Sequence, residues 1–391
     1  MAQAFIVNAV RTAGGRRNGK LSKVHPIDLG ALVLDELVAR TAIDPAQIED
    51  VIFGCVDQVG AQSANIARGC VLSSRTLPES VPGTTVDRQC GSSQQAIHFA
   101  AQAVMSGVHD VVIAGGVELM SLVPLGGNAI AGHKAGMGVP YGQGMKRRYP
   151  GAKFNQFTGA EMIAEKWGFS REALDRFGLS SHQKAAAATK EGRFTREIVP
   201  VEVELEGGGS EKFQADEGIR YDASYEAMAS LKTLSDKGLL TAGTSSQITD
   251  GAAALLVANE AGLEKLRLNP RARIAAMTLA GTDPVIMLTA PIPATQKLLA
   301  RAGKKIGEID LYEVNEAFAS IPMAWLHDIG ADPAKLNVNG GAIALGHPLG
   351  CSGVKLMTTL LHELERSGGR YGIQTMCEGG GLANATLIER L

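Results

Sequence analysis

Several features that would mark a specialised class of protein are scarce in this chain. Its 38 basic and 40 acidic residues leave a formal net charge of -2, so it has no basic excess of the kind that nucleic-acid-binding proteins carry on one face. No segment reaches the roughly 18 consecutive apolar residues that a membrane span needs. The N-terminus has no basic stretch followed by a long apolar core, so we expect no signal peptide and a cytoplasmic location.

Cysteine is also sparse and unevenly spaced. An odd number of scattered cysteines is not a disulfide framework, so reduced thiols are expected. No Cys-x-x-Cys pair and no closely spaced histidine pair is present, which excludes the usual zinc spacing. The glycine pairs do not build the Gly-x-Gly-x-x-Gly pattern of a dinucleotide site. The five cysteines are Cys55, Cys70, Cys90, Cys351 and Cys377.

The chain contains one order of elements twice. A strand, a helix and a second strand are predicted by apolar runs and helical spacing in each half. Alternating strands and helices are typical of an α/β fold. The predicted segments are 4–10, 26–40 and 48–56 in the first half, and 272–277, 293–302 and 309–314 in the second.

A repeated spacing between a cysteine and a glycine also supports a duplication. Cys90 and Cys351 each precede a predicted helix that ends 17 residues later, at Gly107 and Gly368. Chance similarity between two ordinary strand–helix units is the alternative. Residues 120–245 have no counterpart in the second half and predict an inserted lobe with long loops. The expected domains are 1–119 plus 246–270, then 120–245, then 271–391.

Cys90 is the first candidate for chemistry. It stands between a strand-like segment and an Ala-rich helix, and the positive end of a helix dipole favours a thiolate. Gly91 and Ser92 let the backbone turn sharply and let a substrate approach. This pattern predicts a nucleophile, and the alternative is a buried cysteine at a helix start.

Two further candidates lie among glycines. His347 stands in a loop with Pro348 and several glycines, which is expected to expose the imidazole for proton transfer or for donation to an oxyanion. The alternative is a structural loop histidine. Cys377 ends a predicted strand before three glycines, and a thiol pKa near 8.5 suits an acid or base. The alternative there is a core cysteine beside a tight turn.

Asn315 and Glu316 follow the predicted strand 309–314. An amide at the end of a strand can fix a water or an oxyanion. Glu316 is a candidate to orient the histidine. A helix N-cap is the alternative for both residues, since Asn is a preferred cap.

Four short segments, taken together, resemble the motifs of the thiolase family. One such motif is weak evidence, but four in the family's order are specific, and the similarity spans nearly the whole chain. The resemblance implies a duplicated five-layer αβαβα core with an inserted loop domain, assembled as a homodimer or homotetramer. The segments are 90–96, 315–318, 346–350 and 377–381.

The resemblance also implies where coenzyme A binds. Segment 241–246 is similar to the one that lines the pantetheine, which makes Ser246 a candidate CoA contact. Segment 216–220 is similar to the one near the adenine nucleotide, which makes Arg220 another. Residues 155–158 depart from the wording common in the family, and this departure leaves acyl specificity open. Segment 88–95 is similar to degradative acyltransferases, including types linked to steroid breakdown.

The resemblance to the thiolase family implies that the chain acts as an acetyl-CoA C-acyltransferase. Cys90 attacks the 3-oxo carbon while His347 takes its proton, and the Cys90 and Gly379 N–H groups hold the oxyanion. His347 and a water fixed by Asn315 then stabilise the acetyl-CoA enolate, which Cys377 protonates. CoA is a substrate here, and no metal or redox cofactor is required.

Three alternatives remain beside this reading. The first is an acetoacetyl-CoA-forming acetyl-CoA C-acetyltransferase, because the same groups run the reverse condensation. The second is a ketosynthase-type condensing enzyme, which is expected to carry a histidine or an asparagine in place of Cys377. The third is a non-catalytic thiolase-like protein that binds acyl-CoA, against which the intact Cys90, His347 and Cys377 count.

Overall fold

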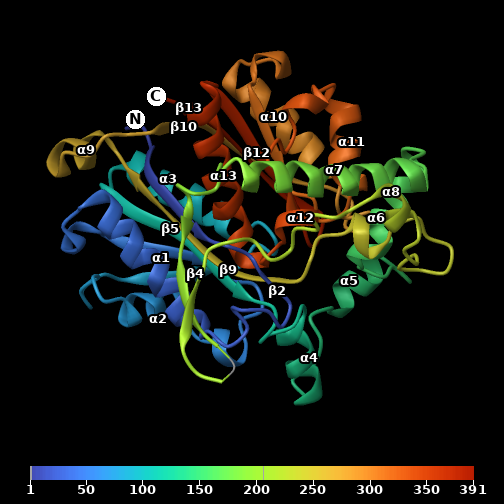
Figure 1. Cartoon of the computed structure of the whole chain (residues 1–391), viewed down its shortest axis with the longest axis horizontal. Helices are drawn as coiled ribbons and strands as arrows, with labels where there is room; N and C mark the ends of the chain where they lie inside the picture. Colours follow the sequence, from blue (N-terminus) through green and yellow to red (C-terminus); the bar gives the residue numbers. More distant parts are fainter. Residues whose placement is uncertain (1, 206) are drawn as a thin grey trace.

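The computed structural model describes residues 2–205 and 207–391 as helices packed around a large mixed β-sheet (Figure 1). The strands are β1 (Phe5–Thr12), β2 (Gly15–Arg16), β3 (Asp50–Gly54), β4 (Gly83–Val86), β5 (Val111–Leu119), β6 (Ile198–Val199), β7 (Val201–Glu204), β8 (Ser210–Phe213), β9 (Thr249–Ala258), β10 (Ala272–Gly281), β11 (Leu311–Val314), β12 (Tyr371–Glu378) and β13 (Leu382–Arg390). The main sheet has the order β11-β12-β13-β10-β1-β9-β5-β3-β4, with β2 beside β9 and β6 beside β1. Strands β7 and β8 form a separate hairpin.

The strand order shows the duplication directly. The two halves meet where β1 runs antiparallel to β10, and the order outward from this junction is β1-β9-β5-β3 on one side and β10-β13-β12-β11 on the other. In both sets the first two pairings are antiparallel and the third is parallel. The predicted strands at 4–10, 48–56, 272–277 and 309–314 correspond to β1, β3, β10 and β11.

Helices complete five layers. The helices that form them are α1 (Pro26–Thr41), α2 (Ile66–Ser73), α3 (Ser92–Ser106), α10 (Pro291–Ala302), α11 (Ser320–Ile329) and α13 (Ser352–Ser367). Helices α3 and α13 pack against each other, α3 on the strands of the first half and α13 on strands of both halves. Helices α1 and α2 cover the outer face of the first half, and α10 covers that of the second with α11 against it (Figure 1). The predicted fold class is confirmed.

Small residues bring the two central helices together. A Cβ on Gly353 would lie 2.1 Å from the backbone N of Gln94, so only glycine allows this close approach. Strands β5 and β9 are buried along their whole length, which explains their continuous apolar runs, because helices cover both faces. The junction of the halves therefore holds the starts of α3 and α13 close together.

Part of the stretch predicted as an insertion forms a lobe beside the second half, while its strand β6 joins the main sheet beside β1, and apolar side chains of residues 198–203 and Phe213 pack on the core of the first half. Its helices α4 (Gly127–Lys134) and α5 (Gln143–Arg148) have no buried residue and project from the body of the molecule (Figure 1). Helices α6 (Gln156–Lys166) and α7 (Arg171–Lys190) pack on α11 and α12. The remaining helices are α8 (Tyr225–Ala229), α9 (Glu260–Leu266) and α12 (Ala342–Leu345). The domain limits given above stay a prediction.

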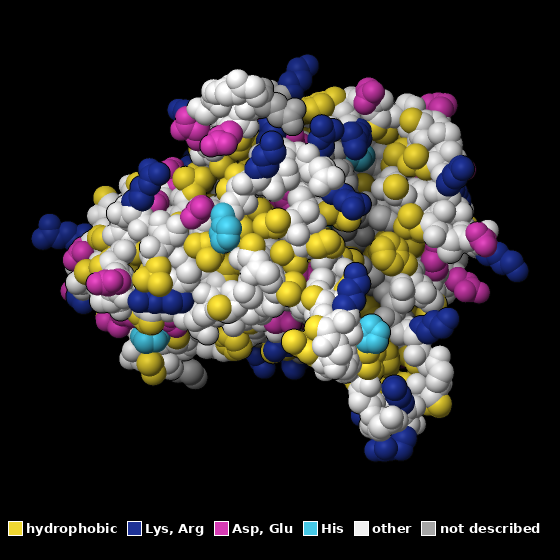
Figure 2. All heavy atoms as spheres, turned by 90° about the horizontal axis from the view of Figure 1, so that it is seen from below, with side chains coloured by type: hydrophobic (Ala, Val, Ile, Leu, Met, Phe, Trp, Pro, Cys, Tyr) yellow, Lys and Arg dark blue, Asp and Glu magenta, His cyan; other side chains and the backbone are white. Residues whose placement is uncertain are grey.

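Two surface properties follow from this arrangement. Figure 2 shows Lys and Arg side chains scattered among acidic and apolar ones over one face of the molecule. Over residues 2–205 and 207–391, no helix is both long enough and apolar enough to cross a membrane.

Candidate active site

Cys90 lies directly before α3, where the sequence places it. Gln89 has a φ of 50°, and Gly91 caps the helix. Cys90 is only 8% exposed, and burial together with the negative charge of Glu378 raises the pKa of its thiol to about 12. The Gly379 backbone N–H acts the other way. The backbone N–H of Cys90 at the helix start also favours the thiolate, as the sequence suggests, but burial and the charge of Glu378 outweigh both N–H groups.

His347 is buried, rather than exposed as the loop sequence suggests. Its Nδ1 lies 2.5 Å from Ser352 Oγ, and the Ser352 hydroxyl donates to the Pro348 carbonyl at 2.7 Å. Since that hydroxyl hydrogen is committed, Ser352 accepts from Nδ1–H, which leaves Nε2 as the lone-pair nitrogen. Burial and the Lys355 charge lower the pKa of His347 to about 3, so the free imidazole is neutral.

The Asn315 amide donates to the lone-pair nitrogen of His347. Its Nδ2 lies 3.3 Å from His347 Nε2, and its buried Oδ1 receives no hydrogen bond from the described residues. The backbone of Asn315 donates to the Thr375 carbonyl of the neighbouring strand β12 at 3.1 Å. Asn315 therefore joins the histidine to the strand that carries Cys377, and its carbonyl oxygen is placed to hold a water.

Cys377 lies near the end of β12 and is fully buried. Burial raises the pKa of its thiol well above the usual value, and the charges of Cys90 and Glu378 add to this. The ordinary thiol pKa assumed from the sequence is therefore wrong here. A thiol with a raised pKa is a weak acid whose thiolate is a strong base, which suits proton exchange with carbon.

A shared cluster brings these segments together. Cys90 packs with Leu349 from the histidine loop and with Met376, which precedes Cys377. Glu118, at the end of β5, accepts the Gly350 N–H at 2.9 Å. The structure thus brings together segments of both halves that carry the buried residues Cys90, His347, Cys377 and Asn315 and the partly exposed Gly379.

Glu316 does not orient the histidine, contrary to the sequence-based suggestion. Its carboxylate accepts hydrogen bonds from Ser181 Oγ at 2.6 Å, Asn337 Nδ2 at 2.8 Å and the Ile343 N–H at 3.2 Å. Ser352 orients the histidine instead. The available signal was its position five residues after His347, at the start of a helix.

The two candidate CoA contacts differ in exposure and in the segments to which they are hydrogen-bonded. Ser246 is partly exposed, and its N–H donates to the Ala317 carbonyl at 2.9 Å, beside Asn315. Arg220 is exposed, and its backbone N–H donates to His182 Nδ1 at 3.1 Å. Ser246 is thus joined to the catalytic segment, while Arg220 belongs to the surface.

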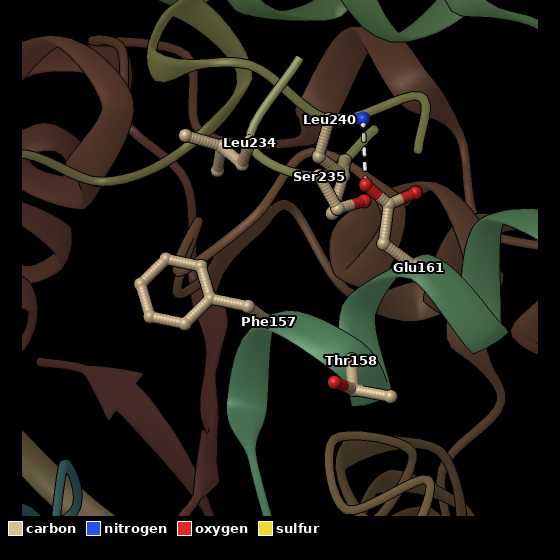
Figure 3. A pocket seen from close by; sticks show the side chains of 6 residues that line it. All are labelled: Phe157, Thr158, Glu161, Leu234, Ser235 and Leu240. Carbon is tan, nitrogen blue, oxygen red and sulfur yellow. Dashed lines mark hydrogen bonds between the residues drawn. The ribbon is translucent and has the colours of Figure 1, made fainter. Parts of the chain in front are cut away.

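A cavity of about 160 Å³ lies beside the catalytic segment. In Figure 3, side chains of α6 face the loop 234–240, and the Glu161 carboxylate accepts the Leu240 N–H at 3.1 Å. Phe157 lines the cavity and packs edge-on against Phe318, with ring centroids 5.3 Å apart. Segment 155–158, whose sequence differs from the one common in the family, therefore helps to line a cavity next to segment 315–318.

Ser352→Ala should lower kcat/KM for acyl transfer by about 10- to 100-fold, less than the roughly 10²–10⁴-fold that a general acid–base group itself contributes, because His347 is kept. The variant loses the acceptor that fixes the Nδ1–H tautomer of His347. Steady-state kinetics with a 3-oxoacyl-CoA and CoA measure the effect, and an unchanged melting temperature shows that the fold is kept. Wild-type kinetics in the variant would show that His347 does not depend on this hydrogen bond.

Comparisons with known proteins agree with this geometry. The sequence model described as "Thiolase, N-terminal domain" matches residues 4–261, and "Thiolase, C-terminal domain" matches residues 268–390. The "Steroid 3-ketoacyl-CoA thiolase FadA6" of Mycobacterium tuberculosis is 54% identical over 393 residues, which cover 100% of this chain and 95% of that protein. The "3-ketoacyl-CoA thiolase" of Aliivibrio fischeri is 42% identical over 397 residues, with 100% of both chains covered.

A solved structure has the same fold. The crystal structure of the Bacillus anthracis acetyl-CoA acetyltransferase superposes with a TM-score of 0.91 at 36% identity, and the match covers 100% of this chain and 99% of that one. The strand order and the buried centre described above therefore belong to a known architecture.

Proposed function

The chain belongs to the thiolase family, and from that premise we propose that it is an acyltransferase that cleaves 3-oxoacyl-CoA with CoA, giving acetyl-CoA and a shortened acyl-CoA. The observation that carries this proposal is the buried meeting of Cys90, Cys377 and a neutral His347 whose Nε2 carries the lone pair, with the Asn315 amide beside it. The relatives named 3-ketoacyl-CoA thiolase support the degradative direction.

The first step forms the acyl-cysteine. His347 Nε2 takes the Cys90 proton, and the thiolate sulfur bonds to the 3-oxo carbon. The carbonyl oxygen becomes an oxyanion, which the N–H groups of Cys90 and Gly379 hold. The Gly379 N–H already acts on the Cys90 sulfur in the free protein, which supports this assignment.

The next steps release two products. The C2–C3 bond breaks, and the electron pair goes to the acetyl-CoA enolate, which His347 and a water on Asn315 stabilise. Cys377 gives its proton to the enolate carbon, and acetyl-CoA leaves. Cys377 then takes the thiol proton of an incoming CoA, whose sulfur displaces Cys90 from the acyl group. His347 returns its proton to Cys90, and every group regains its initial state.

Other features complete the proposal. Ser246 and Arg220 are assigned to CoA, which is a substrate, and no metal or redox cofactor is assigned. The protein acts in the cytoplasm as a homodimer or homotetramer. Exposed apolar side chains from the projecting part of the inserted lobe support an assembly: Ile130, Met137, Val139, Tyr141 and Met145.

A second candidate is acetoacetyl-CoA formation from two acetyl-CoA molecules. The match to an acetyl-CoA acetyltransferase structure favours it, because the same groups catalyse the condensation. The 54% identity to a protein named for steroid 3-ketoacyl-CoA favours a larger acyl group. Acyl size therefore separates the two candidates.

The first test is CoA-dependent cleavage of acetoacetyl-CoA beside a long-chain and a ring-bearing 3-oxoacyl-CoA. Loss of the absorbance of the magnesium–enolate complex reports each reaction. We expect cleavage of the larger substrates, since the relatives act on 3-ketoacyl-CoA. Cleavage of acetoacetyl-CoA alone would favour the second candidate. No cleavage of any substrate, with CoA still bound, would reject both.

A further inference from the structure

Glu378 has no role in the mechanism above, yet it lies within the catalytic centre. It ends β12 directly after Cys377 and is fully buried. A Cβ on Gly91 would lie 2.0 Å from Glu378 Oε1 and 2.5 Å from Cδ. The carboxyl therefore fills the space that Gly91 leaves at the start of α3, next to the nucleophile Cys90.

The carboxyl of Glu378 makes no well-aligned hydrogen bond there: neither oxygen has such a bond to the described residues. Glu118, which is equally buried in the same centre, accepts N–H groups from Val56 at 2.8 Å and Gly350 at 2.9 Å, and the Gln62 Nε2 group at 2.8 Å. Burying an ion without such donors is unfavourable, so Glu378 is held in a place that suits an uncharged acid.

The pKa of Glu378 depends on its surroundings, and the charge of Glu378 in turn affects the pKa of Cys90 and Cys377. Burial raises its pKa to about 8, while the Arg88 guanidinium and the Asn384 backbone amide oppose this rise. In turn, the charge of Glu378 is the largest cause after burial of the raised pKa of Cys90, and it also acts on Cys377. Glu118 adds a smaller effect of the same sign on Cys90.

We propose that Glu378 is a positioning residue that sets the charge state of the nucleophile: its neutral carboxyl allows the Cys90 thiolate to form, and its carboxylate opposes it. The idea rests on the proposed function, in which Cys90 must lose its proton to His347. The developing oxyanion would be held by the N–H groups of Cys90 and Gly379, close to Glu378. A neutral Glu378 does not repel this negative charge, whereas a carboxylate would.

The test is the pH profile of Cys90 alkylation by iodoacetamide in the wild type and in E378Q, read by mass spectrometry of the labelled peptide. At pH 6.5 the two proteins should react at similar rates, since Glu378 is then protonated. Above pH 9, E378Q should react about tenfold faster, which is the effect of one unit in the Cys90 pKa. In the wild type, the rate of Cys90 alkylation should rise less steeply with pH once Glu378 ionises. In E378Q, the rate should show no such change of slope.

A second variant serves if E378Q does not fold. R88Q removes the cation that favours the Glu378 carboxylate, so the change of slope should move to higher pH. Coinciding profiles in the wild type and E378Q, or an unmoved change of slope in R88Q, would overturn the proposal. Thiolysis by the wild type is unaffected by that outcome, so the proposed function is judged separately.

Protein stability gives an independent readout. The folded-state pKa of Glu378 is raised above its unfolded value, so its stabilising contribution is full below the unfolded pKa and is lost as pH rises through about 8. The melting temperature of the wild type should therefore fall more between pH 7 and pH 9 than that of E378Q. An equal loss in the two proteins would show that Glu378 is not protonated in the fold.

Discussion

Cys90→Ser should lower kcat/KM for thiolysis by about 10⁴-fold or more, the range seen when a covalent nucleophile is removed. Serine has nearly the same shape, so the fold should be kept. Its hydroxyl is far less acidic than the thiol, whose pKa is already raised to about 12 by burial and Glu378. Proton transfer to His347 is therefore much less favourable from the hydroxyl than from the thiol.

The matched control is Cys351→Ser. Cys351 precedes α13 as Cys90 precedes α3, and it is also buried, but the mechanism gives it no part. Its variant should stay within about threefold of wild-type turnover, as expected for a residue outside the chemistry. Near-normal thiolysis by the Cys90→Ser variant, or equal losses in both variants, would end the acyl-cysteine mechanism.

The duplicated architecture was predictable because both halves bury similar strands and helices. Burial of apolar strands and the helical spacing of α1 and α10 are local properties of the chain, and they appear as periodic patterns. The match of the two Cys–Gly spacings predicted α3 and α13 within one residue at each end. The short strands β2 and β6 were not predicted, since two residues carry no period.

The sequence was enough to predict which residues form the catalytic centre, but not their burial or their pKa values. Motifs identified Cys90, His347, Cys377 and Asn315, because each stands at the end of an element among small residues. Their burial comes from the contact between halves, which no local pattern contains. The choice of Ser352 over Glu316 as the partner of His347 depends on how loop 346–351 folds back on α13.

Cys377→Ala should separate two steps that Cys90→Ser abolishes together. The alanine variant keeps Cys90, His347 and the Gly379 N–H, so it should still form an acyl-cysteine from an activated thioester. It lacks the group that exchanges a proton with carbon, and general acid–base groups contribute about 10²–10⁴-fold. Deuterium exchange at the acetyl-CoA methyl group should therefore fall by about 10³-fold.

The contrast between variants decides the role of Cys377. Burial raises the pKa of its thiol well above the usual value, so its thiolate is a strong base, as abstraction from a methyl group requires. His347 has a pKa of about 3, so its imidazole is a weaker base than this thiolate. Undiminished exchange in Cys377→Ala would move carbon acid–base chemistry to another group, with the nucleophilic role of Cys90 intact. Loss of both exchange and acyl-cysteine would instead show that Cys377 supports the position of Cys90.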